Sequence, residues 1–184
     1  MQLFYHNKIE DFITLPKEES RHLIKVLRKE INDIIFITDG RGNLFSAKII
    51  LQDFKKCQLK ILKKESQKKQ HNYSLHIAIA PTKNMDRFEW FLEKACEIGI
   101  DEITPIICSR SERKIIKTER GNRILLSAMK QSLKYHLPKL NEAISLTNFL
   151  KSNVDGAKYI GHCEKSDKLE LKNEKLEENM GYHY

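Results

Sequence analysis

The stretch from residue 75 to residue 113 constrains the fold of this chain more than any other feature. Leu75–Ala80 is an apolar run of strand length that Pro81 closes, and Ile103–Cys108 is a second run rich in β-branched residues. Apolar side chains recur at helical spacing between them, at Phe88, Phe91, Leu92 and Ala95. The order strand, helix, strand predicts a right-handed βαβ unit with parallel strands.

Local residues predict where this helix begins and ends. Asp86, with Glu89 three residues later, fits a capping box, and Gly99 stands where a helix is expected to end in a glycine. Polar side chains collect after both strands, and in open α/β sheets ligands bind at these carboxyl ends. They are Lys83, Asn84, Asp86 and Arg87 after the first strand, and Ser109, Arg110, Ser111 and Arg113 after the second.

The N-terminal third favours a small β-barrel with one helix. Pro16 and the acidic residues that follow it predict a helix over Lys17–Lys29. A hairpin turn is expected at Asp39–Asn43, because glycines alternate there between two β-rich runs. The expected strands are Leu3–Tyr5, Ile34–Thr38, Leu44–Leu51 and Cys57–Leu62.

The positive charge of the chain is concentrated in this third. The net charge is +8; residues 1–72 hold 15 Lys and Arg against 9 Asp and Glu, whereas residues 73–184 hold 18 against 16. Arg21, Lys25 and Arg28 stand at i, i+4 and i+7, which places them on one face of a regular helix. Either a polyanion contact or an ordinary solvated lysine-rich surface accounts for this pattern.

The rest of the chain predicts a linker and further α/β elements. Lys63–Asn72 has many charges and no apolar periodicity, so the chain divides into a domain over 1–72, linker included, and a domain over 73–184. The expected later elements are helices at Glu119–His136 and Ser145–Leu150, a third parallel strand at Lys158–Cys163, and a charged helix-favouring segment at Glu164–Glu178.

Composition excludes several classes of protein. Four widely spaced cysteines without a CxxC pair argue against disulfides and zinc, which makes a reducing cytoplasm the expected compartment. The N-terminus carries charges where a signal peptide would be apolar, and no apolar run has the length needed to cross a membrane.

Short motifs along nearly the whole chain occur together in one known family. In the N-terminal third they are Leu3–Tyr5, His22–Arg28 and Asp39–Gly42. The later motifs are Ala80–Lys83, Glu89, Glu93–Gly99, Pro105, Ser109–Ser111, Ala128–Ser132 and Leu137–Pro138. In these motifs the chain closely resembles the 16S ribosomal RNA uridine-N3 methyltransferases of the knotted SPOUT superfamily.

This resemblance implies a PUA-like RNA-binding β-barrel followed by a SPOUT α/β domain. It also implies S-adenosylmethionine as methyl donor, N3 of a uridine in the 16S rRNA of the 30S subunit as target, and a homodimer. No residue is assigned as the general base, and none as a metal ligand. RNA contacts are expected from Arg21, His22, Lys25, Arg28 and Arg41, the last of these at the hairpin tip, and substrate contacts from Lys83, Arg87, Arg110 and Gln131. Glu93, Lys94 and Glu97 also match, with interhelix or dimer contacts as the favoured role.

One part of the family pattern has no counterpart in the sequence. The family holds its methyl donor in a C-terminal trefoil knot with a Gly-Pro-Glu-Gly loop, whereas here Asn179–Tyr184 follows Glu178. Glycine-rich loops allow the close backbone approach that such a cofactor requires. The expectation from sequence is therefore a truncated or frame-shifted family member that neither binds the donor nor methylates RNA. The alternative is a non-catalytic RNA- or ribosome-binding module.

Overall fold

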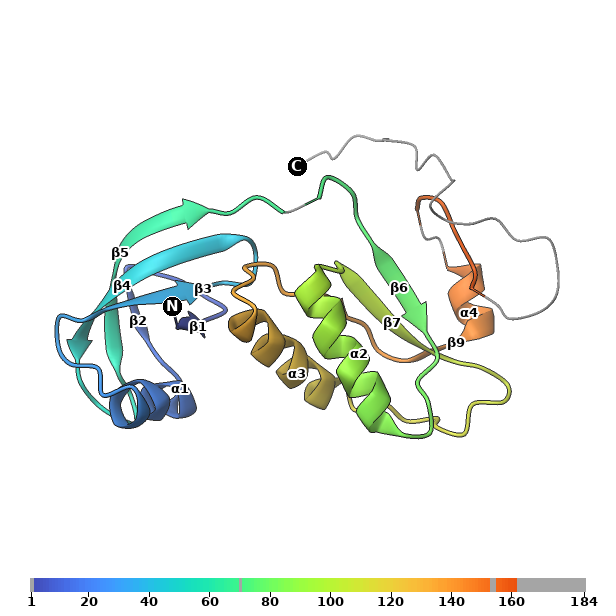
Figure 1. The fold of residues 1–184 in the computed structure, drawn as a ribbon, viewed down its shortest axis with the longest axis horizontal. Helices are drawn as coiled ribbons and strands as arrows, with labels where there is room; N and C mark the ends of the chain where they lie inside the picture. The colour runs from blue at the N-terminus through green and yellow to red at the C-terminus, as the bar shows by residue number, and fades with distance from the viewer. Residues whose placement is uncertain (1, 70, 153–154, 162–184) are drawn as a thin grey trace.

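The computed structural model describes residues 2–69, 71–152 and 155–161. Two sheets lie side by side along the long axis of the molecule (Figure 1). The N-terminal sheet is mixed and has the strand order β1-β3-β4-β5-β2. Its strands are β1 (Leu3–Tyr5), β2 (Phe12–Thr14), β3 (Ile34–Thr38), β4 (Asn43–Leu51) and β5 (Gln58–Ser66).

Alternating side chains give the N-terminal sheet its core. Along β4 the buried positions are every second residue, Phe45, Ala47 and Ile49, which all face the same cluster as Leu23 and Leu59. β1 pairs with β3 in parallel, and β2 pairs with β5 antiparallel. The sheet therefore curls into a half-barrel, which confirms the predicted fold class. β5 runs on to Ser66, so the first residues of the predicted linker belong to a strand.

The predicted helix over Lys17–Lys29 is wrong in its second half. α1 (Lys17–Arg21) is α-helical, but it continues as a π-helical turn, η1 (His22–Val26), in which the Leu27 amide bonds to the His22 carbonyl at 3.0 Å. Arg28 then adopts a left-handed backbone with φ of 52°. The wider turn lets Leu23, Ile24 and Leu27 all pack toward the core. Arg21, Lys25 and Arg28 consequently do not share one face of a regular helix.

The second sheet confirms the predicted βαβ unit. β6 (His76–Ile79) and β7 (Glu102–Ile107) are parallel neighbours, and α2 (Met85–Ile98) connects them. α3 (Thr118–Gln131) packs beside α2 on the sheet face that carries Ile77 and Ile103. The remaining elements are β8 (Lys139–Leu140), β9 (Ile144–Ser145) and α4 (Leu146–Lys151), the last of which confirms the predicted short helix.

The partners of β7 differ from the prediction. β8 and β9 both pair with it in parallel, whereas Lys158–Gly161 has no strand structure. His162 and Cys163, which complete the predicted strand, lie outside the described residues, as does the segment Glu164–Glu178. Strands of two residues are too short to leave an alternating pattern in the sequence, which is why β8 and β9 were not predicted.

The predicted boundaries of α2 are right at one end only. Gly99 ends the helix with a left-handed φ of 102°, as expected. The N-cap is Asn84 and not Asp86, because the Asn84 side-chain oxygen accepts a hydrogen bond from the Asp86 amide at 2.9 Å.

The hairpin turn between β3 and β4 joins the two halves of the molecule. The Gly42 amide donates to the Tyr135 carbonyl at 2.8 Å, and the Leu137 amide donates to the Gly40 carbonyl at 2.8 Å. The turn is thus bonded to the loop that follows α3, and its tip is not the free projection that the sequence suggested. The side chain of Arg41 is nevertheless exposed.

Gly42 offers a direct test of this junction. Its φ is +86°, and a Cβ there would lie 2.4 Å from His136 Nε2 and 3.1 Å from the Gln67 carbonyl oxygen. We expect Gly42→Ala to lower the free energy of unfolding by about 2 to 3 kcal/mol, because left-handed strain and overpacking add. Urea unfolding measures the change.

Gly156→Ala is the matched control. Gly156 has a comparable φ of +93°, and a Cβ added there would meet no atom of the described residues within 4 Å, so this variant isolates the backbone contribution. Equal losses from the two variants would mean that close packing at the junction contributes nothing.

Candidate functional site

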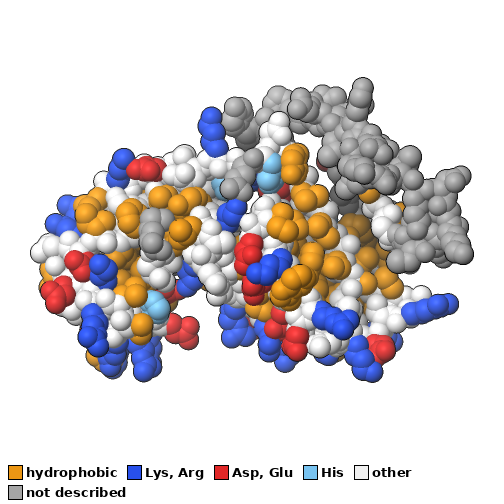
Figure 2. Space-filling view, viewed as in Figure 1, with side chains coloured by type: hydrophobic (Ala, Val, Ile, Leu, Met, Phe, Trp, Pro, Cys, Tyr) orange, Lys and Arg blue, Asp and Glu red, His pale blue; other side chains and the backbone are white. Residues whose placement is uncertain are grey.

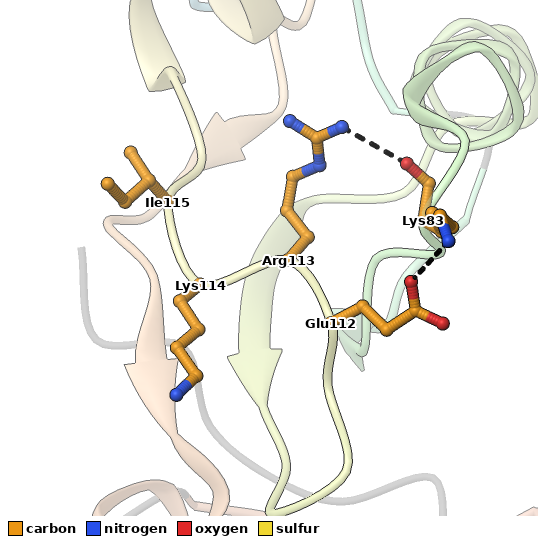
Figure 3. Close-up of a pocket in the computed structure, with 5 residues that line it drawn as sticks. All are labelled: Lys83, Glu112, Arg113, Lys114 and Ile115. Carbon is orange, nitrogen blue, oxygen red and sulfur yellow. Dashed lines mark hydrogen bonds and ion pairs between the residues drawn. The ribbon is translucent and has the colours of Figure 1, made fainter.

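The carboxyl ends of β6 and β7 carry a cationic pocket. It encloses about 430 Å³ and is lined by Lys83 from the loop after β6 and by Glu112–Ile115 from the loop after β7 (Figure 3). Arg113 Nη2 donates to the Lys83 carbonyl oxygen at 3.1 Å, and Lys83 Nζ pairs with Glu112 Oε2 at 2.9 Å. These two contacts tie the loops together, so the pocket follows from the parallel pairing of the strands.

Three of the four predicted substrate residues lie at this edge. Lys83 follows β6, Arg87 is in the first turn of α2, and Arg110 lies in the turn after β7, all with exposed side chains. The Ser111 hydroxyl shapes that turn by accepting from the Cys108 amide at 2.9 Å. Cations on exposed loops suit an anionic ligand such as a phosphate.

Gln131 lies at the opposite end of the sheet. Gln131 is the last residue of α3. The chain then runs to Lys139, which pairs with Glu102 at the amino end of β7. The neighbour of Gln131, Lys130, pairs with Glu19 of α1 at 2.5 Å, so this end of α3 faces the half-barrel. The structure therefore separates Gln131 from the other three candidates, and its role stays a prediction.

The predicted RNA-contact residues are distributed around the half-barrel. Arg21, Lys25 and Arg28 are exposed on or after the α1–η1 segment. The ring of His22 instead turns toward Phe4, with centroids 6.2 Å apart, and its buried Nε2 has no hydrogen-bond partner within the described part of the chain. Arg41 lies at the junction turn, where its backbone forms an isolated antiparallel bridge with His136.

Glu93, Lys94 and Glu97 form a cluster within one helix, whereas the sequence favoured an interhelix or dimer role for them. Lys94 Nζ pairs with Glu93 at 2.8 Å and with Glu97 at 3.0 Å, all within α2. These two carboxylates raise the pKa of Lys94, chiefly through their hydrogen bonds. The interhelix or dimer role of these three residues stays a prediction.

A second cleft, of about 340 Å³, lies at the junction of the two halves and was not predicted. Lys69 forms an ion pair with Asp101 there, and a ring nitrogen of His71, Nε2, lies 2.8 Å from the Gly99 carbonyl oxygen. His136 lines the same cleft, and burial, followed by the positive charge of Lys69, lowers its pKa below the ordinary value of 6.5. Residues from four distant stretches of sequence form this cleft, and no local pattern reveals it.

Comparison with known families identifies what these two halves are. A family model described as RNA methyltransferase domain matches residues 68–182, and one described as RNA methyltransferase PUA domain matches residues 15–62. The first match covers more than half of the chain. The chain belongs to the RNA methyltransferase family, of the SPOUT type, and is similar to the proteins named ribosomal RNA small subunit methyltransferase E.

Individual relatives agree with this assignment. A ribosomal RNA small subunit methyltransferase E from Rickettsia conorii is 29% identical over 84% of this chain and 63% of its own length. A probable rRNA-methyltransferase from Porphyromonas gingivalis is 43% identical, with a TM-score of 0.77, over 82% of this chain and 63% of that one. A methyltransferase E from Neisseria gonorrhoeae, bound to S-adenosyl methionine, shares the fold with a TM-score of 0.73, 23% identity, and coverage of 84% of this chain and 66% of that one. The chain thus spans about three fifths of the length of the curated relatives it matches.

The strand-end pocket does not fit a sulfonium cofactor. Lys83, Arg113 and Lys114 would repel its positive charge, and only Glu112 opposes them. Among the described residues, no glycine lies in the loops that follow β6 and β7, so the backbone there offers no cradle of the kind such a cofactor requires. The described part of the chain also contains no helix long and apolar enough to span a membrane.

The N-cap of α2 can be tested because it fixes the start of the helix beside Lys83. Asn84→Ala removes the side-chain acceptor for the Asp86 amide, and we expect a loss of about 1 kcal/mol in the free energy of unfolding. Asn84→Asp keeps an acceptor and should retain stability. Thermal unfolding of the two variants measures the difference, and equal stability would show that Asn84 does not cap the helix.

The junction cleft predicts a pH dependence of stability. The folded pKa of His136 is depressed, so between that pKa and the unfolded value the unfolded chain binds more protons. Asp101 and Asp39 oppose the shift without reversing it. The contribution of neutral His136 to the free energy of unfolding should therefore be fully present above about pH 6.5. It should be lost as the pH falls from there toward the folded pKa.

His136→Gln should flatten this slope in urea unfolding curves recorded from about pH 5 to pH 8. His6→Gln, at an N-terminal histidine bonded to the nearby Lys8 carbonyl, is the control and should leave the slope unchanged. A slope that persists in His136→Gln would assign it to another group.

Proposed function

We propose that this chain serves in methylation of small-subunit ribosomal RNA, with N3 of a uridine as the target and S-adenosylmethionine as the methyl donor. The loss of donor binding and of activity expected from the sequence stays a prediction, which the experiment below also tests. One observation carries the proposal: an RNA methyltransferase PUA match and an RNA methyltransferase domain match follow each other along the chain. The 43% identity to a probable rRNA-methyltransferase supports the same conclusion. We also propose the division into a half-barrel over 1–72 and a methyltransferase part over 73–184.

The half-barrel is proposed to hold the RNA. Figure 2 shows Lys and Arg side chains along the lower edge of the molecule in this view, under α1 at one end and under α2 and the strand-end loops at the other. A strand of RNA lying along this edge would meet cations at both ends. Phosphate contacts of this kind position a nucleic acid without reading its sequence.

The strand-end loops are proposed to receive the target nucleotide. N3 of uridine lies on the base-pairing edge, so the base must be unpaired or flipped out before it can react. N3 must also lose a proton, and a fixed cation beside the base stabilises the anion that results. Lys83 and Arg113, linked through the Lys83 backbone, are proposed to contact such a base or its flanking phosphates, which their positions in the pocket support. Arg87 and Arg110 extend the cationic edge.

One observation favours a second function, that of a non-catalytic RNA- or ribosome-binding module. Among the described residues, neither the cationic strand-end pocket, which is proposed above to take the nucleotide, nor the glycine-free loops after β6 and β7 suit a sulfonium donor. RNA binding through the half-barrel would be common to both functions. The two functions differ in one consequence: only the methyltransferase makes methylation of a uridine in 16S rRNA depend on the gene.

Deletion of the gene separates the two functions. A methyl group on N3 blocks base pairing, so primer extension on 16S rRNA stops at the modified uridine. We expect the stop to vanish in the deletion strain and to return with the wild-type gene. A Lys83→Ala and Arg113→Ala double variant should reduce methylation about tenfold or more, as loss of electrostatic stabilisation does.

Lys8→Ala is the control for that double variant. Lys8 forms an exposed ion pair with Glu10, at 2.6 Å, in the N-terminal half, and its loss should leave methylation intact. If every stop persists in the deletion strain, the methyltransferase proposal fails. Retained binding of 16S rRNA would then favour the binding module.

A further inference from the structure

The loop between β4 and β5 presents an aromatic ring among lysines. Phe54 is 41% exposed, and its ring has Lys25 Nζ at 4.3 Å and Lys55 Nζ at 5.6 Å from the centroid. Lys25 comes from η1 and Lys55 from the loop itself, so two separate segments of the chain converge on one ring. An exposed phenylalanine has no place in the core, and nothing in the mechanism proposed above uses it.

The shape of this loop is fixed by local hydrogen bonds. Asp53 Oδ1 accepts from the amide of Lys55 at 2.6 Å and from the amide of Lys56 at 3.0 Å. The bond from the Lys55 amide is the main cause of the lowered pKa of Asp53, so the carboxylate stays charged and keeps the turn closed. Gln52 Nε2 also donates to the Lys29 carbonyl at 3.2 Å, which ties the loop to the segment after η1.

The π-helical turn explains how Lys25 reaches the ring. A regular helix would have kept Lys25 on the same face as Arg21 and Arg28. The wider turn of η1 and the left-handed backbone at Arg28 break that face, and Lys25 lies over Phe54 instead. π-helical turns often occur at functional sites.

Single-stranded RNA is the ligand whose chemistry matches this cluster. Each nucleotide offers a flat base and an anionic phosphate, while the cluster offers one exposed ring with the ammonium groups of Lys25 and Lys55 over it, and the exposed Lys56 follows in the same loop. Stacking of a base on an aromatic ring is stronger than the contact of an ammonium group with an exposed ring. A base can therefore replace an ammonium group on Phe54, which leaves that lysine to pair with a neighbouring phosphate. An acidic peptide would use the lysines but not the ring.

We propose that Phe54, with Lys25, Lys55 and Lys56, forms a stacking site for an unpaired base of an RNA strand, with the flanking phosphates on the three lysines. The inference rests on the proposed function in taking RNA as the partner, and it names the point on the half-barrel that holds the strand. The site reads the presence of an unpaired base and not its identity, because every base has a face that can stack.

The test uses the 184-residue chain and a short unstructured RNA of mixed sequence. We expect Phe54→Ala to weaken binding about tenfold, and Phe54→Trp to retain it. Trp90 is the single tryptophan and is 63% exposed, so F54W in a W90F background gives one reporter indole. Its fluorescence should be quenched when RNA stacks on it.

Two further variants distinguish base stacking on Phe54 from the removal of any exposed aromatic ring and from the removal of positive charge. Phe12 is 60% exposed on β2, so Phe12→Ala removes a ring that is more exposed than Phe54 elsewhere on the half-barrel and should leave affinity unchanged. Joint replacement of Lys55 and Lys56 by Gln should reduce the slope of log affinity against log salt by about 1.4, since each phosphate contact to a single strand contributes about 0.7. Phe54→Ala should leave that slope unaltered.

Three results would overturn the proposal. They are equal affinity for Phe54→Ala and wild type, an equal loss in Phe12→Ala, or a reporter indole that responds to phosphatidylglycerol vesicles and not to RNA. The binding assay needs no methyl donor, so its outcome is independent of the primer-extension experiment. A negative primer-extension result would not contradict the stacking site, and a negative binding result would not contradict the methylation proposal.

Discussion

Two backbone hydrogen bonds hold the half-barrel against the parallel sheet. They join Gly42 to Tyr135 and Gly40 to Leu137, and they depend on a turn whose glycine backbone is left-handed. The Lys130–Glu19 ion pair and the contacts around His71 reinforce the same junction. Both candidate surfaces, the lysine-flanked ring of the half-barrel and the strand-end pocket, are placed relative to each other by this turn.

Much of the fold could be predicted because its signals are local. The run Ile34–Thr38 is β3 to the residue, and the helical spacing from Phe88 to Ala95 lies within α2. The π-helical turn at His22–Val26 could not be read in the same way, because its residues carry an ordinary helical pattern and the core decides the geometry. β8 and β9 are held by pairing with β7 and not by any preference of their own two residues.

The candidate sites also differ in whether local sequence signals or tertiary contacts determine them. Lys83, Arg87 and Arg110 could be placed together from the sequence, because the order strand, helix, strand fixes which ends of the strands meet. Gln131 could not be placed from its helix alone, since its position depends on which end of α3 adjoins the half-barrel. Phe54 and the junction cleft were missed for a related reason. Each is made by segments far apart in the chain: Lys55 follows Phe54 directly, but Lys25 reaches the ring only through the fold, and His136 meets the rest of its cleft in the same way.

The hydrogen-bonded turn at residues 39–43 fixes the distance between the two candidate binding surfaces. The distance between the half-barrel and the strand-end loops is set by the backbone hydrogen bonds of this turn and not by the segment that follows β5. Under the proposed function, a folded RNA held by the half-barrel would present to the strand-end loops only those nucleotides that lie at the matching distance. Selection among chemically identical uridines would then depend on that distance, and adding or removing one residue in the turn would change which nucleotide is reached without altering either binding surface.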